Sequence, residues 1–596
     1  MLHESIQLAA RQWLDDPVIA DTDKVEIRRL LDAHDERELT DRFYKDLEFG
    51  TGGMRGVIGE GRNRMNIYTV GAAVQGLANY ISRVGESAKR GGVAIAYDCR
   101  RMSVEFSRRA ALVLAANGIK AYVFDALRPT PELSFVVRHL RCTAGIVITA
   151  SHNPPEYNGL KVYWSDGAQV VPPQDKAIID EVRGVGPFAN IRLADEGSPE
   201  ARKLTEVIGA EVDEAFLTAV DESCLCPDIC RKHGDSLKIV YTPLHGTGHL
   251  LVPEALRRRG FRHVLTEPAQ SKPDGEFPTV KSPNPEEPAA MQLGMALAQR
   301  HAADLVIATD PDADRAGIAV RRGDGTYVLL TGNRIGAILT YFICEQLKSD
   351  GRLPANGLVL STIVSSDLAK IIAGSYGAEV IETLTGFKWI AEEIRRWTEP
   401  AADGSPRKSF LFGMEESYGY LPCVFVRDKD AVTSSAFIAD AAAFAAERGT
   451  TLYGMLEDLF RRFGYFEEGA KSVTMKGESG ARMIETIMNS LREKHPIAIA
   501  GVAVETVTDM LTGIARRVSD GAEVSRFSLP PSDVMVFALA DGTKVIARPS
   551  GTEPKIKFYI LVRSSESNLD RARSHCAERI RMIDADLSAL IARVTA

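Results

Sequence analysis

The segment Ala144-Gly145-Ile146-Val147-Ile148-Thr149 runs directly into Ala150-Ser151-His152-Asn153-Pro154-Pro155. The first part is apolar on both faces, which is typical of a central strand in a covered parallel sheet. The two prolines prevent a simple continuation of the strand. We therefore predict an α/β fold that presents Ser151, beside the His152 imidazole, on a stiff loop. Because ligands gather at the carboxyl ends of parallel strands, the loops after strands are where function is expected.

The same alternation of short apolar runs and helix-like segments recurs before and after this stretch. The first 40 residues favour helices without an assignable function. The first group that follows has strands at Val93–Tyr97, Ala121–Phe124 and 144–149, and a helix over 104–117 with Ser103 as its N-cap and Gly118 past its end. A second group has strands at 237–241, His263–Thr266 and 305–308 and a helix over 252–259, and a third has strands at 358–360, Glu379–Thr383 and 410–412.

The last part of the chain has a different pattern. Strands over 534–540, 544–547 and 557–562 predict an antiparallel meander, with Asp541-Gly542 as a hairpin turn, and a helix over 568–594 closes the chain. The fold class is therefore α/β: three consecutive α/β domains with mixed, mainly parallel sheets, followed by a C-terminal α+β domain. The expected domains are 1–210, 211–326, 327–465 and 466–596.

Composition narrows the class of protein. The chain has 596 residues, of which 45% are hydrophobic and 26% charged, as expected for a globular protein of several domains. The net charge of −8 offers no basic excess for nucleic acid or an anionic membrane. No apolar run approaches the roughly 18 residues of a membrane helix, and eight cysteines are too sparse for a disulfide scaffold. We expect a cytoplasmic protein.

A second functional loop, Asp310-Pro311-Asp312-Ala313-Asp314-Arg315, also follows a predicted strand. Carboxylates at i, i+2 and i+4 can converge on one hard cation, and oxygen ligands favour Mg²⁺, Mn²⁺ or Ca²⁺ over zinc. An EF-hand is excluded, because Arg315 stands where that loop requires glycine. The alternative is a solvated acidic turn, in which the three like charges would repel one another.

Two further loops carry polar groups suited to a sugar phosphate. Gly413-Met414-Glu415-Glu416-Ser417-Tyr418-Gly419 offers acidic and hydroxyl side chains beside glycines, which suit sugar hydroxyls. Arg548-Pro549-Ser550-Gly551-Thr552-Glu553-Pro554-Lys555 offers a guanidinium, two hydroxyls and an open backbone, which suit an anion. Taken singly, each is equally compatible with an ordinary turn or hairpin loop.

A cysteine-rich stretch suggests zinc but does not match a zinc motif. Cys224, Cys226, Cys230 and His233 could supply four soft ligands. Their spacing fits neither a C-x₂-C ribbon nor a zinc finger. We therefore interpret them as free cysteines of a loop.

Together, the functional loops resemble the four signature loops of the α-D-phosphohexomutase superfamily, which contains phosphoglucomutase, phosphomannomutase and phosphoglucosamine mutase. The matching stretches, in the family's order, are TASHNP around Ser151, DPDADR at Asp310, GMEES at Glu415 and RPSGTEP at Arg548. GTGGMRG at 50–56, SPNPEEP at 282–288 and TGFKW at 385–389 resemble the longer branch, which includes bacterial phosphoglucomutases, animal phosphopentomutase and glucose 1,6-bisphosphate synthase. The resemblance implies four domains around one central cleft.

The resemblance also implies roles for particular residues. Ser151 would be the phosphoserine, with His152 beside it, and one Mg²⁺ per chain would be held by Ser151, Asp310, Asp312 and Asp314. Arg55, Lys161 and Lys429 match positions near the transferring phosphoryl group. The implied sugar-phosphate contacts are Arg315, Thr385, Gly386, Lys388, Glu415, Ser417, Arg548, Ser550, Gly551 and Thr552. Met414, Tyr418 and Gly551 stand where relatives vary, which leaves the sugar open.

The implied reaction interconverts glucose 1-phosphate and glucose 6-phosphate through a phosphoserine enzyme, with glucose 1,6-bisphosphate as intermediate and activator. Lys161 or Lys429 would act as general base only if its surroundings lower its pKa. Phosphopentomutase, phosphomannomutase and glucose 1,6-bisphosphate synthase are the alternatives on the same loops. An aspartyl-phosphate transferase using Asp310 and Asp312, and a non-catalytic sugar-phosphate sensor, are more distant ones. The expected partner is a phosphorylated sugar, bound by a monomer or homodimer.

Overall fold

The computed structural model describes residues 3–50, 52–398, 400, 407–475, 477–550 and 555–595. They form two compact units, which are described separately below. The first unit contains the residues up to 335, 342–358 and 387–450, and the second contains 336–341, 359–386 and the residues from 451 onward. The stretch predicted as a third domain therefore contributes to both units. Within the described residues, we find no helix with the length and apolar character needed to cross a membrane.

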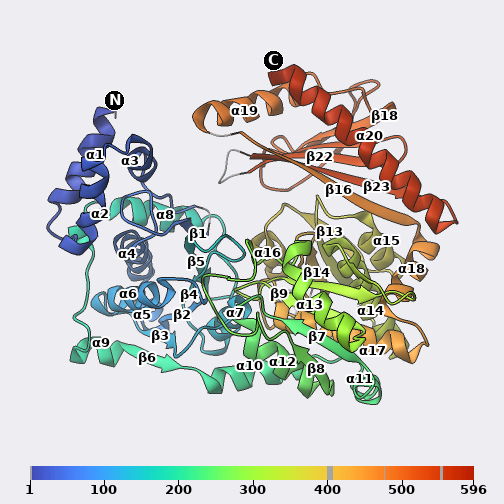
Figure 1. Cartoon of the computed structure of the whole chain (residues 1–596), viewed down its shortest axis with the longest axis horizontal. Coiled ribbons are helices and arrows are strands. Elements are labelled where there is room, and N and C mark those ends of the chain that lie inside the picture. Colours follow the sequence, from blue (N-terminus) through green and yellow to red (C-terminus); the bar gives the residue numbers. More distant parts are fainter. Residues whose placement is uncertain are drawn as a thin grey trace. The chain divides into compact units, whose positions relative to one another are not determined.

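The first unit begins with three short helices, as the sequence predicts: α1 (Glu4–Asp15), α2 (Asp21–Asp32) and α3 (Glu36–Phe43) (Figure 1). They enclose a small core around the buried Trp13 indole, which meets Phe43, Tyr68 and Phe188 edge to face. Aromatic pairs of this geometry add stability beyond the area they bury. Asp35 caps α3 by accepting a hydrogen bond from the Glu38 N–H.

A six-stranded mixed sheet follows, in the order β1-β5-β4-β2-β3-β6. Its strands are β1 (Gly53–Val57), β2 (Val93–Tyr97), β3 (Ala121–Phe124), β4 (Ala144–Ile148), β5 (Tyr157–Trp164) and β6 (Thr205–Ile208). β2, β3, β4 and β6 are parallel, whereas β5 runs antiparallel to β4 and β1. Every residue of β2 and β4 is buried, which confirms the predicted central position of the Ala144 strand.

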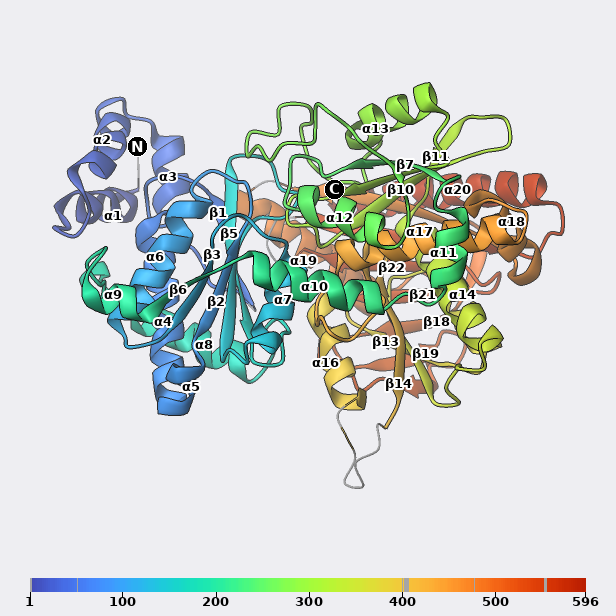
Figure 2. The same ribbon diagram turned by 90° about the horizontal axis from the view of Figure 1, so that it is seen from below.

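Helices cover both faces of this sheet. They are α4 (Ile67–Val84), α5 (Glu86–Gly91), α6 (Ser103–Ala116), α7 (Thr130–His139), α8 (Gln174–Gly184) and α9 (Pro199–Leu204), with a 3-10 turn over Phe188–Asn190. Figure 2 shows the sheet with α6 on one side and α7 on the other, and both helices contact β2. The predicted Ser103 cap is wrong by one residue. Met102, with φ of +65°, takes the cap position, and the Ser103 hydroxyl donates to Asp98 instead.

A second sheet of five strands has the order β11-β10-β9-β7-β8. Its strands are β7 (Lys238–Thr242), β8 (His263–Thr266), β9 (Leu305–Thr309), β10 (Ala316–Arg321) and β11 (Tyr327–Leu329), and its helices are α10 (Ala210–Glu222), α11 (Pro227–His233), α12 (Gly248–Arg258) and α13 (Pro288–His301). The core strands β7, β8 and β9 are parallel, and β10 returns antiparallel to β9. The turn between β9 and β10 is the predicted Asp310 loop, which is therefore held as a tight hairpin.

The rest of the first unit comprises α16 (Phe387–Thr398), β14 (Ser409–Glu415), β15 (Gly419–Leu421) and α17 (Ala431–Glu447). β14 and β15 form an antiparallel hairpin that pairs Glu415 with Gly419. A long helix, α14 (Gly332–Ser349), and a strand, β12 (Gly357–Thr362), each contribute residues to both units.

The second unit contains α15 (Asp367–Ser375), β13 (Glu379–Thr383), α18 (Leu452–Phe463) and an antiparallel sheet. The sheet runs β16-β23-β22-β21-β18-β19-β20, and β17 pairs with β18. Its elements are β16 (Tyr465–Thr474), α19 (Gly477–Glu493), β17 (Ala498–Ile499), β18 (Val502–Asp509), β19 (Ile514–Arg517), β20 (Glu523–Arg526), β21 (Met535–Leu539), β22 (Lys544–Pro549), β23 (Lys555–Ser564) and α20 (Leu569–Thr595).

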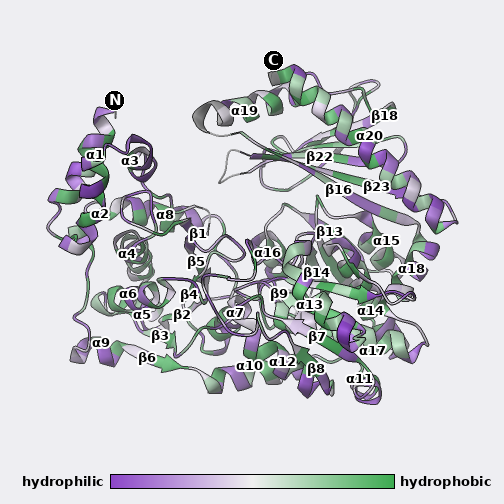
Figure 3. Cartoon of the chain, in the orientation of Figure 1, coloured by the Kyte–Doolittle hydropathy of each residue, from purple (hydrophilic) through white to green (hydrophobic). Residues whose placement is uncertain are grey.

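This sheet confirms the predicted C-terminal meander. β21, β22 and β23 pair antiparallel in sequence order, and Gly542 takes a φ of +80° in the turn after Asp541. α20 packs against β16 and β23 and buries Cys576, Ile583 and Leu587. Figure 3 shows apolar and polar residues mixed along α20, as expected for a helix with one buried face.

Candidate functional site

Ser151 lies at the carboxyl end of β4, on the loop that the sequence predicts. Its φ of +52° is a left-handed conformation, and its N–H donates to Thr149 Oγ1 at 2.8 Å. The side chain is 3% exposed, and its hydroxyl donates to Asp310 Oδ2 at 2.7 Å. His152 Nδ1 lies 3.1 Å from the same hydroxyl oxygen. The predicted serine loop and the predicted acidic loop therefore meet.

Arg100 holds the serine loop in this shape. Its guanidinium is buried and donates to the carbonyl oxygens of Ser151, Asn153, Pro154 and Tyr157. Asp98 balances its charge, with 3.3 Å between Arg100 Nε and Asp98 Oδ2. Backbone strain at a functional residue persists only when surrounding contacts over-determine it, and Arg100 supplies four such contacts. Sequence reasoning placed Asp98 and Arg100 after a strand but did not assign them this role.

The acidic hairpin between β9 and β10 brings three carboxylates together. Asp310, Asp312 and Asp314 are buried, and one oxygen of each lies within 4.8 Å of the others. Asp310 Oδ1 accepts the N–H groups of Asp314 and Arg315, at 3.1 and 3.0 Å. Burial, and then the charges of Asp312 and Asp314, raise the pKa of Asp310 well above its usual range. Proximity of the three carboxylates therefore disfavours full ionisation of the cluster.

These carboxylates fit a divalent cation. Asp312 Oδ1 and Asp314 Oδ1 are buried and have no hydrogen-bond partner within the described ranges of the chain. Buried polar atoms without partners are costly, and oxygen ligands of this kind suit Mg²⁺. The Ser151 hydroxyl, already bound to Asp310, borders the same cluster.

Lys161 and Lys429 supply positive charge to the acidic hairpin. Lys161, on β5, places its Nζ 2.9 Å from Asp312 Oδ2 and 3.5 Å from Asp314 Oδ2. Lys429, just before α17, places its Nζ 3.2 Å from Asp314 Oδ2 and 3.1 Å from Asp428 Oδ1. Gly419 makes room for Lys429, because a side chain there would collide with the lysine stem.

A general base must be unprotonated, but the pKa values of both lysines are raised, which favours their protonated forms. Burial acts to lower the pKa of Lys161, but the charges of Asp312 and Asp314 outweigh it and raise that pKa. For Lys429 too, burial acts to lower the pKa, but the charges of Asp314 and Asp428 outweigh it and raise that pKa. Both ammonium groups are therefore charged in this structure. Neither lysine has the lowered pKa that the role of general base would require.

The remaining predicted residues of the first unit surround this centre. Arg55 on β1 donates to Asn153 Oδ1 at 3.0 Å, which links it to the serine loop. Arg315 Nε lies 3.7 Å from Asp314 Oδ1. Glu415 is buried at the end of β14, and its charge helps to raise the pKa of Lys429, with a smaller effect than those of Asp314 and Asp428. Ser417 is half-buried in the following turn.

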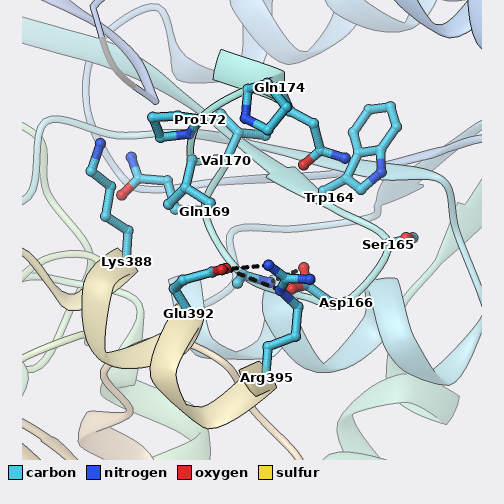
Figure 4. Close-up of a pocket in the computed structure, with 13 residues that line it drawn as sticks. Trp164, Ser165, Asp166, Gln169, Val170, Pro172, Gln174, Lys388, Glu392 and Arg395 are labelled. Atoms are coloured by element: carbon cyan, nitrogen blue, oxygen red, sulfur yellow. Dashed lines mark hydrogen bonds and ion pairs between the residues drawn. The ribbon is translucent and has the colours of Figure 1, made fainter. Parts of the chain in front are cut away.

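Lys388, near the start of α16, lines a cavity of about 430 Å³ (Figure 4). The opposite wall is the segment around Gln169 and Pro172, and Glu392 and Arg395 of α16 form an ion pair beside it. Burial lowers the pKa of Lys388 against the opposing charge of Asp175. A polar cavity beside a lysine can accept an anionic or hydroxylated group.

The other predicted contacts belong to the second unit or lie outside the described residues. Thr385 and Gly386 follow β13, and Gly386 has a φ of +108°. Arg548 stands near the end of β22 and donates to the Tyr559 hydroxyl, and Ser550 N–H donates to the Lys555 carbonyl. Gly551 and Thr552 lie outside the described residues. The phosphate-clamp role of this loop, and the central cleft, stay predictions.

Two groups that sequence reasoning missed also touch the centre. Thr130, the first residue of α7, donates from its hydroxyl to Asp312 Oδ2 at 2.9 Å and from its N–H to the Asp312 carbonyl at 2.9 Å. The Tyr163 hydroxyl on β5 donates to Asp428 Oδ2 at 2.6 Å. Tyr163 is two residues after Lys161 and therefore on the same face of β5, a period-2 signal that could have identified it.

Comparisons with known proteins agree with the fold. Residues 46–186, 214–323 and 331–463 match the phosphoglucomutase/phosphomannomutase α/β/α domains I, II and III, respectively. A phosphoglucomutase of Staphylococcus epidermidis is 38% identical over 514 residues, which are 86% of this chain and 90% of the relative. A phosphoglucomutase of Staphylococcus aureus is 37% identical over 538 residues, which are 90% of this chain and 93% of the relative.

Solved structures show the same fold at lower identity. Parafusin, a phosphoglucomutase from Paramecium, has a TM-score of 0.65 at 17% identity and covers 93% of this chain, and 96% of that chain is matched. A phosphoglucomutase/phosphomannomutase family protein from Burkholderia thailandensis has a TM-score of 0.61 at 18% identity, covering 92% of this chain and 97% of the other. At such identities the likeness concerns the fold.

The fold and the site define an α/β protein in which a loop serine faces a cluster of three carboxylates. The chain belongs to the phosphoglucomutase/phosphomannomutase family, whose members are phosphohexomutases, isomerase-type phosphotransferases. Its three α/β domains and further C-terminal sheet domain are those of the family resemblance drawn from the sequence. The domain boundaries that we placed at 210, 326 and 465 stay predictions.

Proposed function

We propose that this protein is a phosphoglucomutase that interconverts glucose 1-phosphate and glucose 6-phosphate. The observation that carries the proposal is the 2.7 Å hydrogen bond from the Ser151 hydroxyl to Asp310, which joins the serine loop to the acidic hairpin. The Staphylococcus relatives named phosphoglucomutase support glucose as the sugar.

Ser151 Oγ is the phosphoryl carrier in this proposal. The bond between phosphorus and Ser151 Oγ breaks as a bond forms to the free hydroxyl oxygen of a bound hexose monophosphate, and the proton of that hydroxyl passes to the released Ser151 Oγ. The resulting glucose 1,6-bisphosphate turns end for end, and its other phosphoryl group is transferred to Ser151 Oγ. The proton of the Ser151 hydroxyl then passes to the sugar oxygen that is released. The net change is movement of one phosphate between the two ends of the sugar.

The side chains around Ser151 act on charge and position. Lys161 and Lys429, charged and 2.9 and 3.2 Å from the acidic hairpin, stabilise negative charge on the transferring phosphoryl group. The His152 imidazole lies beside Ser151 Oγ. Burial, and then the charges of Arg315 and Arg55, lower its pKa well below the usual value, so the imidazole is neutral. A pKa this low makes the imidazole a poor proton acceptor, so its contribution here is to position Ser151 Oγ.

Asp310, Asp312, Asp314 and the Ser151 oxygen would hold one Mg²⁺. When bound, the ion neutralises the three carboxylates and stabilises charge on phosphoryl oxygens. Glu415 and Ser417 would contact sugar hydroxyls. The loop of Thr385, Gly386 and Lys388 would distinguish the two ends of the sugar. The phosphate would be bound by Arg315, Arg548, Ser550, Gly551 and Thr552. We expect a cytoplasmic monomer or homodimer.

The test is Mg²⁺-dependent conversion of glucose 1-phosphate to glucose 6-phosphate with catalytic glucose 1,6-bisphosphate. Ribose 1-phosphate and mannose 1-phosphate are run in parallel. We expect fast turnover of the glucose compound and loss of nearly all activity in Ser151→Ala, with Ser574→Ala, an exposed serine of α20, as the matched control. Near-normal turnover by Ser151→Ala would remove the carrier role. Slow glucose turnover with fast ribose turnover would replace glucose by a pentose and leave the carrier role intact.

A further inference from the structure

A second polar cluster lies in the first unit, built from other residues than the acidic hairpin. Cys224 follows α10, Cys226 precedes the first residue of α11, and Cys230 stands one turn further along that helix. Asp440 faces them from the middle of α17. Cys226, Cys230 and Asp440 are buried, whereas Cys224 is partly exposed and leaves a route from solvent.

One ligand atom each of Cys224, Cys230 and Asp440 lies within 4.8 Å of the others, which is close enough for a shared ion. Cys230 Sγ lies 3.9 Å from Cys224 Sγ and 3.7 Å from Cys226 Sγ. Asp440 Oδ1 lies 3.2 Å from Cys230 Sγ, and Asp440 Oδ2 lies 3.7 Å from Cys224 Sγ. With zinc–sulfur bonds of about 2.3 Å and zinc–oxygen bonds of about 2.0 Å, a tetrahedral site requires about 3.8 Å between sulfurs and about 3.5 Å between sulfur and oxygen.

The surroundings orient the carboxylate as an outer-shell partner does. The buried Arg259 guanidinium donates to Asp440 Oδ2 at 2.8 Å and to the Ser223 hydroxyl at 2.9 Å. Metal-binding carboxylates in proteins are commonly held by such hydrogen bonds. Asp440 otherwise stands among alanines on a helix whose residues are buried on all sides. The ion pair with Arg259 offsets the cost of burying this carboxylate, and Oδ1 faces the Cys230 sulfur at 3.2 Å.

The tertiary structure also revises the ligand set considered from the sequence. His233 is not part of the cluster, because its Nε2 pairs with Glu447 Oε2 at 2.6 Å. Asp440, 210 residues from Cys230, takes its place. A carboxylate this remote in sequence lies outside any local motif spacing.

We propose that Cys224, Cys226, Cys230 and Asp440 bind one soft divalent cation of the zinc class. Cys224, Cys230 and Asp440 supply three ligand atoms that lie within 4.8 Å of one another, and Cys226, 3.7 Å from Cys230, would add the fourth. Three thiols and one carboxylate are donor types found in structural sites. The ion would tie α11 and the end of α10 to α17. This site is independent of the proposed mutase reaction and of its Mg²⁺.

The experiment uses Co²⁺ as a spectroscopic probe of the full-length, reduced protein, in excess Mg²⁺ to occupy the acidic hairpin. We expect one Co²⁺ per chain with a thiolate-to-cobalt charge-transfer absorption that zinc displaces. In Cys230→Ser the absorption should be lost and zinc should bind at least about 10-fold more weakly. Cys142→Ser, which alters another buried thiol, is the matched control and should bind as the parent chain does.

Three results would overturn the proposal. The first is Co²⁺ binding without thiolate absorption, and the second is an absorption that survives Cys230→Ser. The third is a disulfide between two cluster cysteines in protein purified in air, if the protein still binds no Co²⁺ after that disulfide has been reduced. If Cys230→Ser does not fold, Cys226→Ser should weaken the thiolate absorption, and Asp440→Asn should weaken zinc binding while the thiols remain. Zinc should raise the Tm of the parent chain and of Cys142→Ser but not of these variants.

Discussion

The hydroxyl of Thr130 should set the affinity of the acidic hairpin for Mg²⁺. It donates to Asp312 Oδ2 at 2.9 Å, and both side chains are fully buried. This bond, together with that from Lys161, occupies Oδ2 and leaves the buried Oδ1, which has no hydrogen-bond partner among the described residues, as a candidate metal ligand. Thr130→Val removes the hydroxyl at nearly constant volume and keeps the backbone hydrogen bond from residue 130 to the Asp312 carbonyl.

The size of the effect follows from the type of bond. A buried hydrogen bond to a charged group contributes about 1.5–3 kcal/mol, and each 1.4 kcal/mol is a factor of ten in affinity. We therefore expect Mg²⁺ to bind Thr130→Val about 10–100-fold more weakly, which is the range typical of outer-shell partners of metal ligands. Thr130→Ser keeps the hydroxyl and should stay within about threefold of the parent protein.

Two measurements check this prediction. Calorimetric titration with Mg²⁺ gives the affinity directly, and the Mg²⁺ concentration for half-maximal mutase activity gives it in the working enzyme. Glucose 1-phosphate affinity at saturating Mg²⁺ serves as the control for general damage to the site. A Thr130→Val protein that binds Mg²⁺ within twofold of the parent would refute the idea that the hydroxyl orients the carboxylate.

Three other predictions concern the acidic hairpin and the N-terminal helices. Asp312→Asn should raise the half-maximal Mg²⁺ concentration and lower turnover together, and an unchanged Mg²⁺ titration would count against the carboxylate cluster as the metal site. Lys429→Met should lower kcat about 100-fold with little change in KM, as expected for charge stabilisation in the transition state; a change confined to KM would contradict it. Burial, and then the charge of Asp23, raise the pKa of Glu60 to about 7, so its contribution to stability is present below its unfolded pKa and is lost as pH rises through about 7. Glu60→Gln should therefore gain Tm relative to the parent chain between pH 5 and pH 8, and a Tm difference that is constant with pH would disprove this.

The sequence predicted those parts of the site that depend on neighbouring residues. The apolar strand before Ser151, the prolines after it, the three aspartates at alternate positions and the Asp541-Gly542 turn are local patterns, and each occurs where expected. Resemblance of four short loops was enough to predict the family, because loop residues that touch a ligand are constrained in type and spacing. The Ser103 cap failed by one residue because the Asp98 carboxylate, five residues away, takes its hydroxyl.

By itself, then, the sequence determined the class of fold, the loops that carry chemistry and the family to which the chain belongs. Only the tertiary structure decided which distant groups meet. Thr130 reaches Asp312 across 182 residues, Arg100 reaches the Ser151 carbonyl across 51, and Asp440 reaches Cys230 across 210. Strand and turn preferences act over a few residues, whereas these contacts depend on strand order and helix packing. The charges of Lys161 and Lys429 follow the same rule, because the carboxylates that keep them protonated are supplied mainly by other parts of the chain.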